Sequence, residues 1–528
     1  MSSKMVLGSN IENIYSLTPV QEGMLYHKLM NSDSSAYIVQ HLFELNGLIN
    51  EQKVEDAIQL VAMKHEVLRT SIVYEKLTIP RQIILKNRTI EYERIDLSDI
   101  AVHDLNNKMD TIAQLDVDRG FDLQRDSLLR VKLVYMGSNQ YKMLWTFHHI
   151  IIDGWSLSIL FSDFKTYYDM LDRGKSLQSI MSIVEVDKKS NEKYGDYVKW
   201  LEQQNVDEGI TYWDNLLSDY DGAADIKSME QLPLAMETVS LSTMKLSKEQ
   251  TARLQNLAAT HHTTMNTMVE TAWGMLLQLY TGAKDVVYGK VISGRHVAIR
   301  GIEKIVGPFI ITIPARISCR RDDMIAEVLR RVQLQGTKST AYSYCPLQKI
   351  MSLTKQKSDL IKYLYAYENY ELDENLLTQH NDGLGLKIET YREQTNYDLA
   401  LIVSYEDGYL RFQMQYTPNH YGSREIEAML LRLQAILLSF DDKPEMKVSE
   451  LETITGKEKE QILGAFNDTY LPYAKDETIP ALWEEQVAHT PDAIAVVYED
   501  NNVTYDALNR KINQVAWALR SLHIQPDD

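Results

Sequence analysis

Cysteine is scarce in this sequence: Cys319 and Cys345 are the only two among 528 residues. Two cysteines do not imply a disulfide framework. Apolar runs of about 18 residues are also missing, which argues against a membrane-spanning helix. The start, residues 1–5, carries no long apolar stretch, so we expect no signal peptide. These absences together predict a cytoplasmic protein.

Positive charge is in deficit as well. Lys and Arg number 55 against 74 Asp and Glu, which gives a formal net charge of −19. Nucleic-acid binding needs a basic footprint and anionic membranes attract basic segments, so the charge balance argues against both partners. The apolar fraction of 44% allows sizeable cores, and the length leaves room for about three or four domains.

Common nucleophile and metal motifs are missing too. The sequence has no G-x-S-x-G elbow, and no known motif surrounds either cysteine, so nucleophilic catalysis is poorly supported. Two adjacent histidines, His148 and His149, rarely reach one metal ion, and no cysteine or second carboxylate lies near them at ligand spacing. We therefore expect no metal site.

The chain is organised around residues 145–156, which read Trp-Thr-Phe-His-His-Ile-Ile-Ile-Asp-Gly-Trp-Ser. The alternation before this stretch predicts a strand, and the helical spacing of apolar residues after it predicts a helix with Ser156 as N-cap. Adjacent strand residues point to opposite faces, so we expect one histidine to face a cleft and the other to pack inward.

Each polar residue of this stretch has a chemical use. A histidine titrates near neutrality and can exchange a proton at physiological pH. A buried Asp153 would need a cationic or hydrogen-bonding partner, and Gly154 would permit a tight turn. From the residues alone, a satisfied pair of core histidines remains an open alternative, and a metal site remains a weaker one.

Composition divides the chain into five parts. Residues 1–14 are short and polar, whereas residues 15–178 and 179–450 each carry strand and helix patterns of similar type. Residues 451–475 form a polar, irregular connector. Residues 476–528 contain a strand, a turn and a helix, which is too little for a core of its own.

The motif His148-His149-x-x-x-Asp153-Gly154 resembles the HHxxxDG signature of condensation domains in nonribosomal peptide synthetases. Other acyltransferases of the chloramphenicol acetyltransferase-like superfamily carry HHxxxD as well. Further stretches resemble the family's other motifs, in the family's order, over about residues 11–450. They are Leu17-Thr18-Pro19-x-Gln21-Glu22-Gly23, His65-Glu66-x-Leu68-Arg69-Thr70, Tyr194-x-Asp196-Tyr197-x-x-Trp200, Ser293-Gly294-Arg295, Val306-Gly307-x-Phe309, Glu368-Asn369-Tyr370 and Thr395-Asn396-Tyr397-Asp398-Leu399.

The resemblance implies an α/β (α+β) fold of two chloramphenicol acetyltransferase-like lobes in a V-shaped pseudodimer with a central tunnel. Residues 15–178 would form the N-terminal lobe and residues 179–450 the C-terminal lobe. A donor peptidyl carrier protein would deliver an aminoacyl or peptidyl thioester, and the amine of an aminoacyl thioester on an acceptor carrier would attack it. The phosphopantetheine arms belong to the carriers, so no cofactor is expected on this domain.

The resemblance also implies residue roles. His149 would be the functional histidine, acting as a general base or by positioning the amine, while His148, Asp153 and Gly154 would be structural. The family usually has Arg where this chain has Lys64, so Lys64 or Arg69 is the expected partner of Asp153. Ile311 stands where the family tends to have Asn. The expected tunnel or supporting residues are Gln21, Trp155, Ser156, Ser293, Arg295, Thr312 and Asn396.

Both ends of the chain resemble parts of larger synthetases. Residues 1–14 resemble docking segments, so we expect an upstream synthetase subunit as a partner. Residues 476–528 resemble the truncated start of an adenylation domain, joined by a linker at 451–475. The opening motif resembles domains that take a D-configured donor and an L-acceptor.

Three rival functions remain. They are an epimerization domain, another HHxxxD acyltransferase, and a non-catalytic platform that recruits carriers. Heterocyclization domains replace both histidines by Asp, so His148 and His149 exclude that class.

Overall fold

The computed structural model describes residues 10–31, 35–190, 192–222, 225–226, 239–368, 384–393, 395–442, 446–473 and 475–525. The chain divides into two compact units, Met1–Thr455 and Gly456–Asp528. Most of the expected docking segment, residues 1–9, lies outside the described residues, as do Asn369 and Tyr370 of one expected motif.

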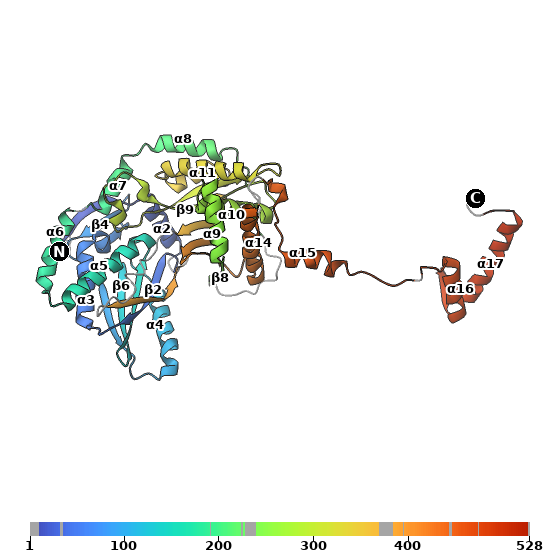
Figure 1. Ribbon diagram of the computed structural model, residues 1–528, viewed down its shortest axis with the longest axis horizontal. Coiled ribbons are helices and arrows are strands. Elements are labelled where there is room, and N and C mark those ends of the chain that lie inside the picture. The colour runs from blue at the N-terminus through green and yellow to red at the C-terminus, as the bar shows by residue number, and fades with distance from the viewer. Residues whose placement is uncertain are drawn as a thin grey trace. The chain divides into compact units, whose positions relative to one another are not determined.

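A five-stranded sheet of order β12-β2-β7-β6-β5 forms the centre of the N-terminal lobe (Figure 1). Its strands are β2 Ile38–Asn46, β5 Glu91–Asp96, β6 Leu129–Gly137, β7 Gln140–His148 and β12 Gly385–Arg392. A smaller sheet of order β1-β4-β3 joins β1 Ile11–Ser16, β3 Thr70–Val73 and β4 Arg81–Leu85. The helices of this lobe are α2 Pro19–Met30, α3 Glu51–Lys64, α4 Leu105–Arg119, α5 Gly154–Asp172 and α6 Leu177–Ser190.

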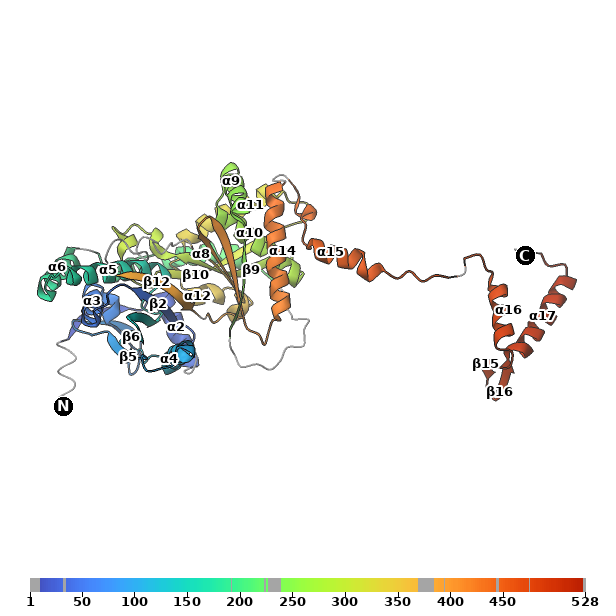
Figure 2. The ribbon, with the colours of Figure 1, turned by 60° about the horizontal axis from the view of Figure 1, so that its bottom comes forward.

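Strand β12 comes from the C-terminal half of the sequence but pairs with β2, as Figure 2 shows by the adjacent labels. In the antiparallel register Tyr391 lies opposite His41, and Arg392 lies opposite Gln40. The expected division of the lobes at residue 178 therefore omits one strand of the first lobe's main sheet, because that strand follows some two hundred residues later.

The C-terminal lobe has a six-stranded sheet of order β10-β9-β11-β13-β14-β8. Its strands are β8 Ser240–Lys245, β9 Asp285–Ser293, β10 Ile310–Ser318, β11 Tyr363–Glu368, β13 Leu399–Glu406 and β14 Tyr409–Tyr416. The β13–β14 pair is the hairpin that Asp407-Gly408 predicts, and both turn residues have positive φ. The longer helices are α8 Val206–Leu217, α9 Lys248–Thr260, α10 Met265–Thr281, α11 Ile325–Ala341 and α14 Ser423–Asp442, and α12 Leu347–Ser352 is a short one. Helix α7 Tyr194–Glu202 packs against β1 of the first lobe.

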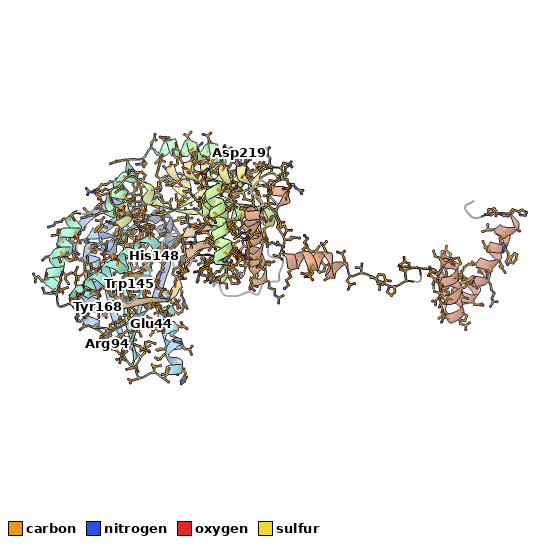
Figure 3. The ribbon with its side chains drawn as sticks, in the orientation of Figure 1. Glu44, Arg94, Trp145, His148, Tyr168 and Asp219 are labelled. Atoms are coloured by element: carbon orange, nitrogen blue, oxygen red, sulfur yellow. The ribbon has the colours of Figure 1, made fainter. Side chains whose placement is uncertain are left out.

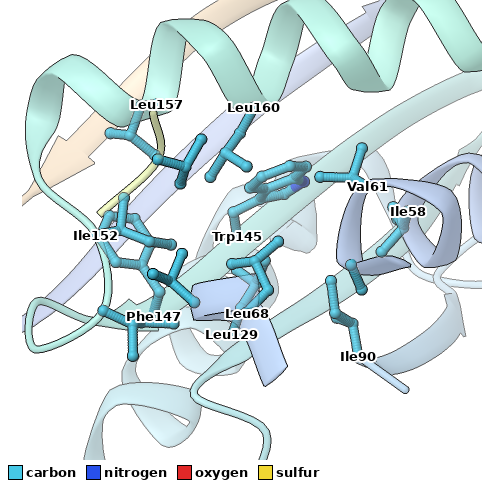
Figure 4. Packing of buried hydrophobic residues seen from close by; sticks show 14 of the residues in the cluster. Ile58, Val61, Leu68, Ile90, Leu129, Trp145, Phe147, Ile152, Leu157 and Leu160 are labelled. Carbon is cyan, nitrogen blue, oxygen red and sulfur yellow. The ribbon is translucent and has the colours of Figure 1, made fainter. Parts of the chain in front are cut away.

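Trp145 anchors the core of the N-terminal lobe. Its fully buried ring lies between Leu157 and Leu160 on α5 and Val61 on α3 (Figure 4). The ring centroid of Phe161 is 4.8 Å away. This packing fixes the strand before the histidine pair against the helix after it, so the turn between them is held at both ends.

The second unit is small and rests on one hairpin. Strands β15 Ile494–Tyr498 and β16 Asn501–Thr504 pair, and helices α15 Gly456–Leu463, α16 Ile479–His489 and α17 Tyr505–Ser521 accompany them. Val487 is the one residue of these helices that is buried among those described. In the described parts of the whole chain, no helix combines the length and apolar character that crossing a membrane needs.

Candidate active site

The histidine pair lies where β7 turns into α5, as the sequence pattern predicts. Strand β7 ends at His148, and α5 begins at Gly154. The expected N-cap at Ser156 is wrong: Asp153 is the N-cap, and its Oδ1 accepts a hydrogen bond from the Ser156 N–H at 2.9 Å. Asp153 takes that position because a carboxylate both caps the helix and complements its positive end. Gly154 is the first helical residue, and its φ is not positive, so the turn itself does not demand glycine.

His148 packs inward. Its side chain is 2% exposed, its Nδ1 accepts a hydrogen bond from the Ile150 N–H at 3.1 Å, and Phe121 meets its ring edge to face. Figure 3 labels it at the end of the strand that carries Trp145. Burial lowers the pKa of His148 to about 3, so the ring is neutral at neutral pH.

His149 faces the other way and lines a cavity. Its N–H donates to the Tyr37 carbonyl at 2.8 Å, and Tyr37 has the left-handed backbone conformation, with φ of 68°. The imidazole Nε2 lies 3.2 Å from Glu393 Oε1. Burial by itself lowers the pKa of His149, but the hydrogen bond to Glu393 and the charges of Glu393 and Asp153 outweigh it, so the pKa is raised above its ordinary value.

The cavity has a volume of about 1680 Å³ and lies between the two lobes. Its wall takes residues from α2, from the β7–α5 turn, from β9 and β10, and from the segment before β13. Among the expected residues, those on the wall are His149, Asp153, Gly154, Trp155, Ser293, Thr312 and Asn396. Ile311, the departure from the family pattern, also lies there, so the wall is apolar at that point.

Asp153 is held by Arg295, not by Lys64 or Arg69. Arg295 Nη2 lies 3.1 Å from Asp153 Oδ1, and both side chains are almost fully buried. Arg295 Nη1 donates to the carbonyls of Ile302 and Ile305 at 2.7 Å each. The buried charge pair is therefore fixed by backbone carbonyls on its cationic side.

Two further donors complete the shell of Asp153. The Phe309 N–H donates to Oδ2 at 3.0 Å, and the Ser156 hydroxyl donates to Oδ1 at 2.6 Å. The Ser156 oxygen in turn accepts from the Gly307 N–H at 3.0 Å. The start of α5 is thus tied to the C-terminal lobe by a buried polar network, and Ser156 supports that network.

Lys64 and Arg69 bind other carboxylates. Lys64 Nζ lies 2.7 Å from Asp163 on α5, and Arg69 Nη1 lies 2.6 Å from Glu12 on β1. Arg69 also donates to the Ala62 carbonyl at 3.1 Å. The prediction that one of them pairs with Asp153 is therefore wrong, because Asp163 and Glu12 are the carboxylates that they contact.

The remaining expected residues take different positions. Gln21 is buried and donates to the Ile150 carbonyl at 3.0 Å, so it supports the turn from α2 and does not line the cavity. Trp155 is 37% exposed, and its indole N–H donates to the Glu303 carbonyl at 3.0 Å. Asn396 Oδ1 accepts from the Tyr37 hydroxyl at 2.9 Å, which joins the two lobes across the cavity.

Sequence reasoning missed Glu393, the carboxylate beside His149. It directly follows β12 and precedes the Thr395-Asn396-Tyr397-Asp398 motif by two positions, which is the one local signal that points to it. Within the described ranges, no group of three or more His, Cys, Asp or Glu side chains is arranged to hold a metal ion.

Comparisons with known proteins identify the family to which the chain belongs. The sequence model of the family described as Condensation domain matches residues 11–463. The chain is 34% identical to Bacitracin synthase 1 of Bacillus licheniformis over 513 residues, and 34% identical to Tyrocidine synthase 3 of Brevibacillus parabrevis over 515 residues. Both alignments cover 97% of this chain but only 10% and 8% of the relatives, so the chain spans a small part of their length.

Solved structures show the same fold. A four-domain holo nonribosomal peptide synthetase bound to AMP and glycine aligns with a TM-score of 0.75 at 20% identity, over 98% of this chain and 39% of that one. The first condensation domain of the calcium-dependent antibiotic synthetase, in complex with a substrate analogue, aligns with a TM-score of 0.65 at 17% identity, over 84% of this chain and all of that one. The two lobes are therefore the chloramphenicol acetyltransferase-like pseudodimer, and the chain belongs to the condensation domain family of nonribosomal peptide synthetases, whose members form amide bonds.

Proposed function

We propose that this chain forms a peptide bond between two carrier-bound thioesters at His149. The acceptor amine attacks the donor thioester carbonyl and the C–N bond forms. The C–S bond then breaks, and the donor arm leaves as a thiol that takes up the proton lost by the amine. The observation that carries the proposal is the position of His149, which faces a cavity between the lobes while His148 packs into the core. Holding two tethered reactants in one cavity supplies much of the rate, because it replaces a bimolecular encounter.

The partners follow from the same reaction. A donor and an acceptor peptidyl carrier protein would insert their phosphopantetheine arms into the cavity, which is large enough for both reacting ends. The domain needs no cofactor of its own.

An upstream synthetase subunit would dock on residues 1–14, and a D-configured donor with an L-acceptor is the stereochemistry that the opening motif supports. Such a synthetase would work in the cytoplasm.

We also propose that residues 476–528 are the start of an adenylation domain, with residues 451–475 as its linker. The exposed apolar side chains at the C-terminal helix α17 support this, because such side chains in a folded domain normally pack against another surface. On α17, Val515 and Trp517 are 58% and 71% exposed, and Leu522, directly after the helix, is 72% exposed.

The recruiting platform is the rival that one comparison favours. The X-domain of teicoplanin biosynthesis, solved in complex with OxyB, aligns with a TM-score of 0.70 at 19% identity. Two features count against that rival: His149 lines the cavity, and Asp153 is held by a complete set of hydrogen bonds. A platform would need neither feature.

Dipeptide formation from loaded carriers tests the proposal. A panel of donor and acceptor carriers, each loaded with an aminoacyl thioester, is mixed with the chain, and the product is followed by mass spectrometry. His149→Ala should lose about a hundredfold in rate, the loss expected when the reacting amine is no longer held in position, while keeping its circular dichroism. A matched control is His103→Ala, an exposed histidine on the N-terminal lobe, which should behave as the wild type. Undiminished product from His149→Ala would refute the assignment.

A further inference from the structure

Glu393 and His149 occupy equivalent places on two parallel strands. Strand β2 runs antiparallel to both β7 and β12, so β7 and β12 run in the same direction and end at one edge of the sheet. His149 is the first residue after β7, and Glu393 is the first residue after β12. The topology therefore brings together two side chains that are 244 residues apart.

The carboxylate of Glu393 is held in place. Oε1 lies 3.2 Å from His149 Nε2, and the Tyr391 hydroxyl donates to Oε2. The Gln415 amide donates to the Glu393 carbonyl at 2.8 Å, which fixes the backbone from β14. The Glu393 side chain is 22% exposed and lines the cavity, so it is open to a substrate on one side.

The hydrogen bond fixes where the histidine proton is. Burial raises the pKa of Glu393. The hydrogen bonds from His149 and Tyr391 and the charges of His149 and His41 lower it and outweigh burial. The carboxyl group is therefore anionic at neutral pH. A carboxylate only accepts hydrogen bonds, so Nε2 must carry the proton. His149 Nδ1 is buried, and in the described part of the chain it makes no regular hydrogen bond to another residue.

This state leaves a carboxylate, and not a free imidazole lone pair, as the acceptor group that faces the cavity. An α-amino group has a pKa of about 7.7–8.0 in water, so it enters largely as an ammonium at pH 7. Asp153 is not available to it, because Arg295, Ser156 and Phe309 already occupy its oxygens. Other carboxylates on the cavity wall, such as Asp225 and Asp398, are not bonded to His149.

We propose that Glu393 binds the positively charged α-amino group of the acceptor aminoacyl thioester and so places its nitrogen beside His149. The ammonium replaces the His149 N–H as the partner of Oε1, while Tyr391 keeps Oε2 in position. The inference rests on the proposed function, because it assumes an aminoacyl acceptor in this cavity. It makes Glu393 a specificity determinant for an amine over an uncharged acceptor.

Two non-hydrolysable probes test the inference by binding alone. One is the amide analogue of an alanyl-pantetheine thioester, and the other is its propionyl counterpart, which lacks the amino group. The wild type should bind the alanyl probe about ten- to hundredfold more tightly at pH 7, the range of a charged hydrogen bond. Glu393→Gln should lose this preference, and Glu393→Asp should recover part of it.

The matched control is Glu389→Gln. Glu389 lies on β12, the strand that Glu393 follows; it is paired with Lys142 at 2.6 Å and is not on the cavity wall. Its variant should keep the wild-type preference, and both variants should keep the wild-type circular dichroism at pH 7, which shows that they fold. Any of three results overturns the inference: the wild type binds the two probes equally, it binds neither at millimolar concentrations, or Glu393→Gln keeps the wild-type preference. If the wild type forms no dipeptide from any loaded pair, the proposed function fails separately.

Discussion

Arg295 and Asp153 form a buried ion pair across the two lobes, although 142 residues separate them. The pair fixes the first turn of α5 directly after the histidine turn. A buried pair of this kind stabilises one arrangement of the lobes, since either partner left alone is an uncompensated buried charge.

Arg295→Ala should lower the free energy of unfolding by about 3–5 kcal/mol, because it leaves the Asp153 carboxylate buried without its cation. Lys64→Ala should cost clearly less, since Lys64 is partly exposed and its partner Asp163 keeps a contact with His65 at 2.6 Å. Urea unfolding followed by fluorescence measures both. An equal loss for the two variants would contradict the pairing that the structure gives for Asp153.

Glu393→Gln should lower the pKa of His149 below the ordinary value of a histidine. In the wild type, burial lowers this pKa and Glu393 is the first contribution that opposes it, so its removal leaves burial dominant. A proton NMR titration of the imidazole, assigned with His149→Ala, measures the change. A His149 pKa that stays above the ordinary value in the variant would show that Glu393 is not the cause.

The same pair predicts how stability depends on pH. The pKa of His149 is raised, so its contribution is present at low pH and is lost as pH rises through that folded-state pKa. The pKa of Glu393 is lowered, so its contribution is lost as pH falls through its folded-state pKa. The stability difference between wild type and Glu393→Gln should therefore be largest in the window between the two. Urea unfolding over a series of pH values checks this, and a difference that grows steadily toward alkaline pH would contradict it.

Tyr37→Phe should cost about 0.5–1.5 kcal/mol of stability, because it removes one neutral hydrogen bond, from the Tyr37 hydroxyl to Asn396. Asn396→Ala also removes the contact of the amide with His27 at 3.2 Å, so its loss should be larger. A double-mutant cycle in urea isolates the shared bond. Strictly additive losses would show that this link between the lobes contributes nothing to folding.

Trp145→Ala should destabilise the protein by about 3–5 kcal/mol through the cavity that it leaves between α3 and α5. Trp145→Phe should cost less, because much of the ring volume remains and the buried indole N–H has no hydrogen-bond partner in the described residues. Thermal unfolding measures both variants. A Phe variant as unstable as the Ala variant would mean that packing volume does not decide this site.

Local pattern predicts the part of the site that is local. The strand to His148, the turn and the helix from Gly154 follow from alternation and helical spacing, and the opposite orientations of His148 and His149 follow from strand geometry. The prediction of Ser156 as N-cap is wrong because Asp153 and Ser156 are both good capping residues three positions apart. Periodicity alone does not choose between them.

The partners of these residues are not local. Arg295 and Glu393 reach Asp153 and His149 only through the register of β9, β10 and β12, which no short window of sequence contains. The family resemblance pointed to Lys64 because the family has a basic residue at that position. In the structure, Lys64 instead forms an ion pair with Asp163. Long-range pairing is thus where prediction from this sequence ends.

Strand β12 also decides how the protein can be made in parts. A fragment that stops near residue 178 would lack β12 and would leave β2 at the edge of the sheet, with its N–H and C=O groups unpaired along a largely buried, apolar strand. Such an edge invites pairing between molecules and aggregation. Expression of the first lobe alone should therefore yield insoluble material. Supplying residues 384–393 in trans as a peptide offers a route to recover it.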